Sequence, residues 1–455
     1  MPGPRFLRLL HRVYRGGASV NHYFAGRIRP VGIACCLALV VSSGLGLGQP
    51  RGPVYLVFSF TLALLTLALV WAFARRPRGL RAERHFPRFA TAGEPTRGKI
   101  RVTNPGKRRL AAAWLAETPP DPRPGLERFL HAREPGESQR NAFDRTFLYY
   151  RWQWLLDRRK LYDGGGSADA FSLRPGESAE VAVELTPRRR GIIRFDDLRL
   201  LPPDPLGLFQ RRIRLPAPPA TLTVLPVRHR LPPIELPGSA RFRIGGEAAS
   251  NAIGQSGEFI GLRDYRPGDP IRQIHWKSWA KTGRPIVMEL EDTFFPRHGL
   301  VFDTFPAPGD EDLFEDAVSI AASFASALDT RESLLDLMFI KDRAHVVTVG
   351  RGMARPEKLL EVLAGVEAEP VEHFDTLARL ALRYRDELTS CLVICCGWSD
   401  RRVGFLRQLA AGGLECALLA VGRGPAPDAF PGHWIQSGQL ARDLGKLPRR
   451  LVMSH

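Results

Sequence analysis

Two uncharged apolar runs near the N-terminus constrain this chain more than any other feature. They extend from Val31 to Gly48 and from Val54 to Ala74, and a short Gln-Pro-Arg-Gly-Pro break separates them. The second run is long enough to cross a hydrocarbon core of ~30 Å as a helix, whereas the first is shorter and rich in glycine. Because they follow each other so closely, the two runs predict a transmembrane helical hairpin over residues 31–74.

The arginines around these runs predict the orientation of the hairpin. They are frequent outside it and nearly absent between the two runs, so the positive-inside rule places both termini in the cytoplasm. A second span follows the first at once, which disfavours a signal peptide. We therefore expect a multi-pass protein of the inner (cytoplasmic) membrane whose residues 1–30 form a basic cytoplasmic segment. The cations are Arg5, Arg8, Arg12, Arg15, Arg27 and Arg29 before the first run, Arg51 between the runs, and Arg75, Arg76, Arg78, Arg81 and Arg84 after the second.

Length and net charge indicate how many domains the chain forms and what kind of partner it binds. At 455 residues it is long enough for two folded domains plus appendages. The net charge of +18 favours an anionic partner, which we expect to include an anionic membrane surface. The basic residues are spread along the chain and no nucleic-acid-binding motif occurs, so we expect no nucleic-acid partner. The six cysteines show no C-x-x-C or zinc spacing, which indicates reduced thiols in a cytoplasmic compartment.

Short alternating runs predict a β-rich domain over residues 75–240. Strands are expected near 99–103, 179–185, 191–195, 198–200 and 221–225, and their hairpin spacing favours an immunoglobulin-like sandwich. An insertion, 119–167, interrupts it and carries the aromatic run 147–156. That run has two open interpretations: an element packed on the sandwich, or a segment at the bilayer interface with aromatic rings at headgroup depth.

Strand and helix patterns alternate over residues 299–455. Buried strands are expected at 300–303, 335–340, 392–396 and 416–421, with helices at 313–328, 374–382 and 402–409 among them. This alternation predicts a doubly wound α/β domain whose sites lie at the carboxyl ends of the strands.

A dense polar and aromatic stretch, Gly257 to Gly283, lies between the two soluble domains within the segment 241–298. Pro267-Gly268-Asp269-Pro270 predicts a turn, because proline presets φ, glycine admits positive φ and aspartate caps. Around it, cations alternate with carboxylates and aromatic rings. The candidate binding residues are Arg263, Asp264, Tyr265, Gly268, Asp269, Arg272, Trp276, Lys277 and Lys281.

This stretch closely resembles the signature of the bacterial family catalogued as domain of unknown function 58. The matching pattern is an aromatic residue, then L-R-D-Y-x-P-G-D, then R-x-I-x-W-K-x-x-A-K-x-G, from Phe259 to Gly283. Arg188-Arg189-Arg190-Gly191 and the Asp-Pro-Leu-Gly-Leu-Phe run at 204–209 also match that family, and we interpret the latter as a turn with an apolar plug. The resemblance implies a MoxR-type AAA+ ATPase as partner, and a C-terminal domain similar to von Willebrand factor A domains.

Domains of that kind often bind Mg²⁺ through D-x-S-x-S at the end of the first strand. Here Asp303 is retained, but Phe305 and Ala307 occupy the serine positions. A lone carboxylate does not make an all-oxygen site. We therefore expect no bound metal and no other cofactor.

No catalytic arrangement is evident, since the chain contains no G-x-S-x-G elbow, P-loop or H-E-x-x-H motif. The first hypothesis is a membrane-anchored protein-interaction module or scaffold facing the cytoplasm, with the signature as a docking face or as a clip between domains. The second is an enzyme that uses the Arg/Asp/His cluster, with His275 beside Asp264 and Asp269. The third is a structural factor in cell-envelope assembly.

Overall fold

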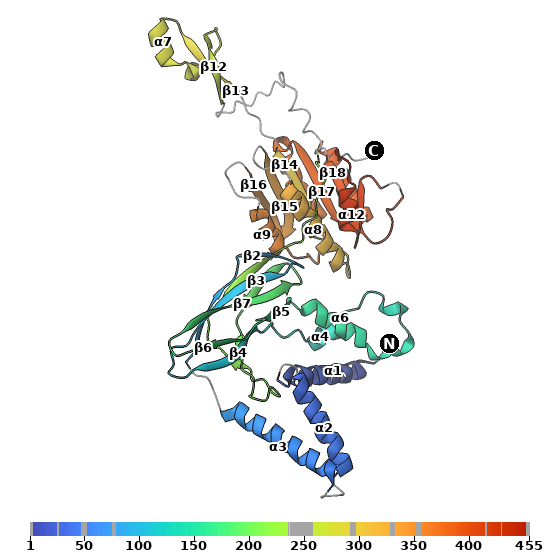
Figure 1. Cartoon of the computed structure of the whole chain (residues 1–455). Coiled ribbons are helices and arrows are strands. Elements are labelled where there is room, and N and C mark those ends of the chain that lie inside the picture. Colours follow the sequence, from blue (N-terminus) through green and yellow to red (C-terminus); the bar gives the residue numbers. More distant parts are fainter. Residues whose placement is uncertain are drawn as a thin grey trace. The chain divides into compact units, whose positions relative to one another are not determined.

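The computed structural model separates into two units, each described by itself. The first comprises residues 1–227 with 361–365, and the second comprises 228–360 with 366–455. Figure 1 shows the elements of both along the chain. The structure describes residues 3–24, 27–46, 52–74, 79–234, 236, 258–291, 297–327, 333–350, 357–414, 416–428 and 430–451.

Three helices begin the first unit: α1 (Pro4–Phe24), α2 (Pro30–Gly46) and α3 (Pro53–Ala74). Helices α2 and α3 contact each other, and Figure 1 shows that they lie at an angle. Among the described residues, one helix is long and apolar enough to cross a membrane, α3 over Pro53–Trp71, while α2 is apolar but shorter. The two expected apolar helices are therefore present. The loop between them, and Arg75, Arg76 and Arg78, lie outside the described residues.

Two β-sheets form the middle of the first unit and confirm the predicted β-rich domain. The larger sheet has the order β1-β3-β7-β5-β4-β9-β10, with β6 paired to β4, and the smaller has the order β2-β11-β8. Side chains of β7 alternate between buried and exposed, as period-2 patterning predicts. The strands are β1 (Arg81–His85), β2 (Phe89–Thr91), β3 (Thr96–Thr103), β4 (Leu110–Glu117), β5 (Tyr162–Gly166), β6 (Phe171–Leu173), β7 (Ser178–Pro187), β8 (Gly191–Phe195), β9 (Leu198–Leu201), β10 (Ile213–Arg214) and β11 (Ala220–Leu225).

The insertion is helical and ends earlier than predicted. It contains α4 (Leu126–His131), η1 (Glu137–Gln139), α5 (Ala142–Phe147) and α6 (Tyr149–Arg159), and it packs against α1. The chain then enters β5, which pairs with β7, so residues 162–166 belong to the sheet. Gly164 and Gly165 have φ of 81° and 86° at a bulge, and a Cβ on Gly164 would lie 2.8 Å from the Glu184 carbonyl oxygen. The glycines thus allow a β-bulge.

The second unit contains a six-stranded mixed sheet of order β16-β15-β14-β17-β18-β19, in which only β16, among its strands, runs antiparallel to its neighbour. Helices α10 and α11 pack on one face, and α8 contacts β17 and β18. This confirms the predicted strand–helix alternation. The elements are β14 (Arg297–Phe302), α8 (Glu311–Ala327), β15 (Leu334–Lys341), β16 (Arg343–Val349), α10 (Phe374–Arg383), η4 (Arg385–Glu387), β17 (Ser390–Cys396), α11 (Asp400–Ala411), β18 (Cys416–Gly422), β19 (His433–Gln436) and α12 (Leu440–Gly445). Helix α9 (Glu357–Gly365) is divided between the units, since its residues 361–365 are assigned to the first.

Candidate functional site

The signature folds as a small hairpin of its own. Strands β12 (Glu258–Asp264) and β13 (Ile286–Glu291) pair antiparallel, and between them lie η3 (Ile271–Gln273) and the short helix α7 (Trp276–Thr282). Ile274 and Val287 are buried at the centre of this element, where their backbones form an isolated bridge. Residues 241–257 and 292–296 of the predicted segment lie outside the described residues. We call the element over residues 258–291 the signature hairpin.

An ion pair closes the turn of the signature hairpin. Both terminal nitrogens of Arg263 donate to the Asp269 carboxylate, each at 2.7 Å, and the backbone N–H of Arg266 donates to it at 2.7 Å. The Arg263 hydrogen bonds and then that of Arg266 lower the pKa of Asp269 to about 2. Gly268, with φ of 110°, provides the conformation that the turn requires. Of the alternating cations and carboxylates in this stretch, Arg263 and Asp269 thus form an ion pair.

His275 has a structural role at the start of α7. Its Nδ1 lies 2.7 Å from the Ser278 hydroxyl and accepts the Ser278 N–H at 3.3 Å, so it caps the helix. No hydrogen bond or ion pair joins it to Asp264 or Asp269 within the hairpin as described. The contacts of His275 that the structure describes are thus those of a helix cap.

Three large apolar side chains of the signature hairpin are exposed. Trp276 is 60% exposed, Ile271 is 69% exposed and Leu262 is 44% exposed. The Trp276 ring stacks on that of Trp279, with centroids 5.3 Å apart. Large apolar side chains that remain this open on a folded element mark binding surfaces more often than isolated exposed ones do.

The hairpin is also rich in cations. Between residues 261 and 288 the chain carries six arginines and lysines against two aspartates, one of which is already paired with Arg263. The remaining cations make no ion pair with any residue that the structure describes. The free cations are Arg266, Arg272, Lys277, Lys281 and Arg284, all of them exposed.

The structure divides the predicted site residues into two groups. Arg263, Gly268 and Asp269 hold the turn, and Tyr265 is half-buried beside it, its N–H bonded to the Pro285 carbonyl. Asp264, Arg272, Trp276, Lys277 and Lys281 are exposed. That Arg263, Asp269, Arg272, Trp276 and Lys277 act as one unit, which holds two domains together and presents a face to a partner, stays a prediction. The first two form the ion pair of the turn, and the other three are exposed.

The retained Asp303 at the end of β14 is wholly buried and paired with an arginine. Its carboxylate accepts hydrogen bonds from the N–H groups of Phe305 (2.8 Å) and Cys396 (3.1 Å), and from Arg402 Nε at 2.8 Å. The same guanidinium donates to the Phe305 carbonyl at 2.6 Å and to the Ser399 hydroxyl at 3.2 Å. Burial raises the pKa of Asp303, and the positive charge of Arg402 opposes that rise. A protein cation, contributed by α11, thus satisfies this carboxylate.

The first of the two serine positions holds a residue of the apolar core. Phe305 is fully buried and packs edge-on against Phe374 at 5.0 Å, within the core beneath α10. Of the nearby acidic residues, Asp310 pairs with Arg423 at 2.9 Å, while Glu311 and Asp312 lie in the first turn of α8. Within the part of the chain that is described, no three His, Cys, Asp or Glu side chains gather as metal ligands.

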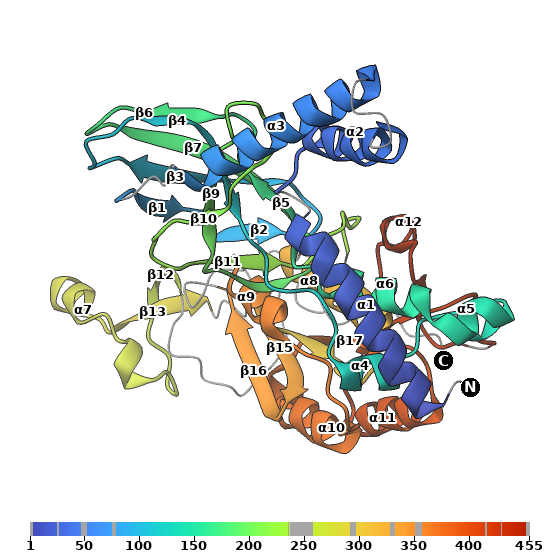
Figure 2. The same cartoon turned by 90° about the horizontal axis from the view of Figure 1, so that it is seen from below.

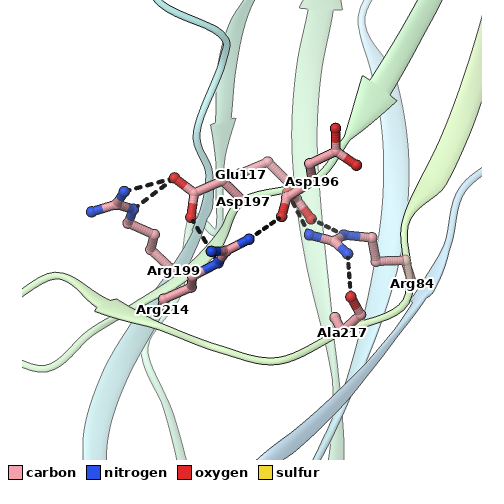
Figure 3. Close-up of polar contacts among 7 residues, drawn as sticks. All are labelled: Arg84, Glu117, Asp196, Asp197, Arg199, Arg214 and Ala217. Carbon is pink, nitrogen blue, oxygen red and sulfur yellow. Dashed lines mark hydrogen bonds and ion pairs between the residues drawn. The ribbon is translucent and has the colours of Figure 1, made fainter.

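A second buried ion pair, which the sequence pattern did not reveal, lies in the larger sheet of the first unit. Arg84 of β1 donates to both Glu117 oxygens, at 2.6 and 3.1 Å, and each side chain is 1% exposed (Figure 3). The guanidinium also donates to the carbonyls of Ala217 and Pro218. Arg84, one of the arginines that follow the second apolar run, thus forms a buried pair within the sheet.

A hollow of about 630 Å³ adjoins this pair, lined by residues including Arg81, Glu83, Asp196 and Arg214. Figure 3 shows Arg214 between Asp196 and Asp197, with its Nε 3.8 Å from the Asp197 carboxylate. The wall therefore carries both signs of charge, and it selects neither an anion nor a cation.

Comparisons with known proteins identify one similar sequence and no established family. No family model matches the chain. It is 24% identical over 218 residues to the uncharacterized protein YeaD of Bacillus subtilis (strain 168), an alignment that covers 46% of this chain and 53% of that protein. A solved structure, the CARDB domain of the PF1109 protein from Pyrococcus furiosus in complex with di-metal ions, is 12% identical. It covers 32% of this chain and 88% of that domain at a TM-score of 0.17, too low to support an argument.

Proposed function

We propose that this protein is a membrane-anchored interaction module that binds an acidic protein partner through the signature hairpin. The observation that carries the proposal is the exposed Trp276, stacked on Trp279 in a hairpin with five exposed cations that make no ion pair with a described residue. Tryptophan and arginine dominate the binding energy of protein interfaces, because they combine large contact area with directional hydrogen bonds. A partner with carboxylates around an apolar pocket complements this surface.

The resemblance to the domain of unknown function 58 family suggests what that partner is. We propose a MoxR-type AAA+ ATPase. The second unit then supplies a von Willebrand factor A-like domain in which Arg402, and not Mg²⁺, neutralises Asp303. Its mixed sheet, and the position of Asp303 after β14, support this assignment.

The apolar helices provide the anchor in this proposal. Along α3, Leu56, Phe60 and Leu67 are 60–68% exposed, which would be unfavourable in water but suits contact with lipid tails. We propose that α2 and α3 cross the inner membrane as a pair with both termini in the cytoplasm. A C-terminal alkaline phosphatase fusion should then be inactive. An active fusion would place the C-terminus outside the cytoplasm and contradict the proposed orientation.

Recovery of the partner from cells tests the docking surface. Tagged protein, purified in detergent with and without ATP, should lose its companion ATPase on Trp276→Ala or Lys281→Glu while its melting temperature stays unchanged. Lys107→Glu is the matched control, because Lys107 is an exposed lysine of the first unit.

The alternative role of the hairpin, a clip between domains, gives a different result. Both hairpin variants would then melt earlier, and recovery of the partner would fall only in proportion to the folded protein. Recovery unaffected by either variant would refute docking through this surface.

A further inference from the structure

Helix α1 carries two apolar faces, and only one of them is covered. Leu10 is buried on the first face, together with Phe129, Trp152 and Leu155 of the insertion. Polar bonds fix the same contact: His11 Nε2 lies 3.0 Å from the Pro124 carbonyl oxygen, and the Tyr14 hydroxyl donates to the Phe147 carbonyl at 2.8 Å. Figure 2 shows α1 lying across α4 and beside α6.

The second face is an exposed apolar stripe. Leu9, Val13, Val20 and Phe24 are 53, 59, 58 and 49% exposed, and their spacing of 4, 7 and 4 residues puts them along one line of the helix. At the N-terminal part of α1 the apolar surface continues onto α5. The Phe6 ring lies 6.2 Å from Phe147, which in turn lies 4.5 Å from Phe143, a side chain that is 69% exposed.

Arginines follow one edge of this stripe. Arg5, Arg8, Arg12 and Arg15 are all exposed, and helix α1 contains no acidic residue. None of the four makes an ion pair with a residue that the structure describes. An amphipathic helix with this distribution binds the boundary between lipid headgroups and acyl chains, where the apolar face inserts and the cations contact phosphate.

Arginines and a tyrosine lie in the sequence where the stripe ends and the apolar helices begin. After α1, Arg27 stacks on the Tyr23 ring at 3.8 Å, and the Arg29 N–H bonds to the Leu208 carbonyl in the turn that packs on α2 and α3. Burial, followed by the charges of Arg199 and Arg27, lowers the pKa of Arg212 in the same region. Cations and tyrosine thus concentrate where the apolar helices begin, as they do at membrane–water interfaces.

We infer that α1 lies in the plane of an anionic bilayer surface, with Leu9, Val13, Val20 and Phe24 among the acyl chains and the four arginines on lipid phosphate. The inference rests on the proposed anchoring by α2 and α3 and deepens it. The helical insertion then serves as a clamp that holds α1 flat, because it covers the opposite face. Charge complementarity favours lipid over a second copy of this strongly basic chain.

Spin labels on the full-length protein test the inference in vesicles with and without phosphatidylglycerol. A label at Val13→Cys reports on the stripe, and one at Leu62→Cys reports on the apolar helix α3. A label at Ile192→Cys, an exposed apolar position on β8, is the control. The background carries Cys35→Ala and Cys36→Ala, since the other four thiols are buried. Accessibility to oxygen and to a water-soluble nickel complex gives the depth of each label.

The expected result is a deep label at 62, an aqueous one at 192, and a label at 13 roughly 5–10 Å into the headgroup–acyl boundary. In phosphatidylglycerol vesicles, changing all four arginines to glutamine should return position 13 to the accessibility found without that lipid. If 13 is as aqueous as 192 while 62 is deep, α1 does not lie in the bilayer although the anchor stands. An aqueous label at 62 would refute the anchor itself.

Two further outcomes would also overturn the inference. Equal shielding of position 13 with and without phosphatidylglycerol would remove the role of anionic lipid. Dipolar coupling between labels at position 13 on different molecules, at low protein-to-lipid ratio, would show that a second copy covers the stripe.

Discussion

Removal of Arg402 should destabilise the second unit strongly, because it leaves Asp303 buried without its cation. The Asp303 and Arg402 side chains are 0% and 3% exposed, so water cannot replace the lost partner. Breaking a buried ion pair by removing one member typically costs ~3–5 kcal/mol. For a domain of this size, Arg402→Met should therefore lower the melting temperature of the unit by roughly 6–20 °C.

The neighbouring arginine provides a matched control. Arg401 pairs with Glu372 at the surface, and its side chain is 75% exposed. Arg401→Met should cost no more than about 1 kcal/mol, as is usual for exposed pairs. Asp303→Asn combined with Arg402→Met should recover about 1–3 kcal/mol relative to the sum of the single changes, since the asparagine oxygen still accepts a backbone N–H bond.

Scanning calorimetry of the full chain in detergent measures these changes, and hydrogen exchange of β14 and β17 peptides assigns the transition. A loss below 1 kcal/mol for Arg402→Met would show that the buried carboxylate does not depend on this guanidinium. If Mg²⁺ raised the melting temperature of the wild-type unit, metal and not Arg402 would neutralise Asp303.

Two other predictions concern pH and helix packing. Burial lowers the pKa of His298 to about 4, so the folded state favours the neutral ring. As the pH falls from ~6.5 to ~4, the second unit should therefore lose about 3 kcal/mol of unfolding free energy. The variant His298→Gln should reduce this dependence on pH, which melting curves at several pH values would measure. At Gly32, a Cβ would lie 2.3 Å from the Leu208 carbonyl oxygen, whereas Gly44 has open space. Gly32→Ala should thus cost about 1–3 kcal/mol in detergent melting, with Gly44→Ala much less harmful; equal effects would refute the close approach.

Hydrophobic periodicity predicted much of the fold because burial dictates it directly. The strands of the second unit were predictable since nearly every side chain in β17 and β18 is buried, which produces continuous apolar runs. Strand β5 was not, because its three glycines, Gly164 to Gly166, look like a flexible linker in sequence. The positive φ angles of Gly164 and Gly165 are explained only by the close approach of β7, which is a tertiary constraint.

The turn at 204–209 was predictable as well, since Asp and Gly define it locally. Asp204 accepts the N–H groups of Leu206 and Phe209, and Leu208 is buried against α3 residues Leu65 and Ala68, which confirms a turn with an apolar plug. The Arg402 partner of Asp303 was not predictable, because 99 residues separate them. Within the signature, the alternation of charges indicated that cations pair with carboxylates, but it did not reveal that Arg263 is the partner of Asp269 or that Trp276 is exposed.

The contacts between the insertion and α1 fix the orientation of this helix. In the proposed anchoring by α2 and α3, the amphipathic helix α1 would be free to leave the bilayer surface if its other face were not held. Here the bonds of His11, Tyr14 and Ser19 to residues 123–147 link the first twenty residues to the insertion. Because Arg151 in turn pairs with Glu137 while largely buried, the clamp has its own polar core. The aromatic run is then needed less as a membrane anchor than as the support that keeps α1, with its exposed stripe and arginines, in a fixed orientation.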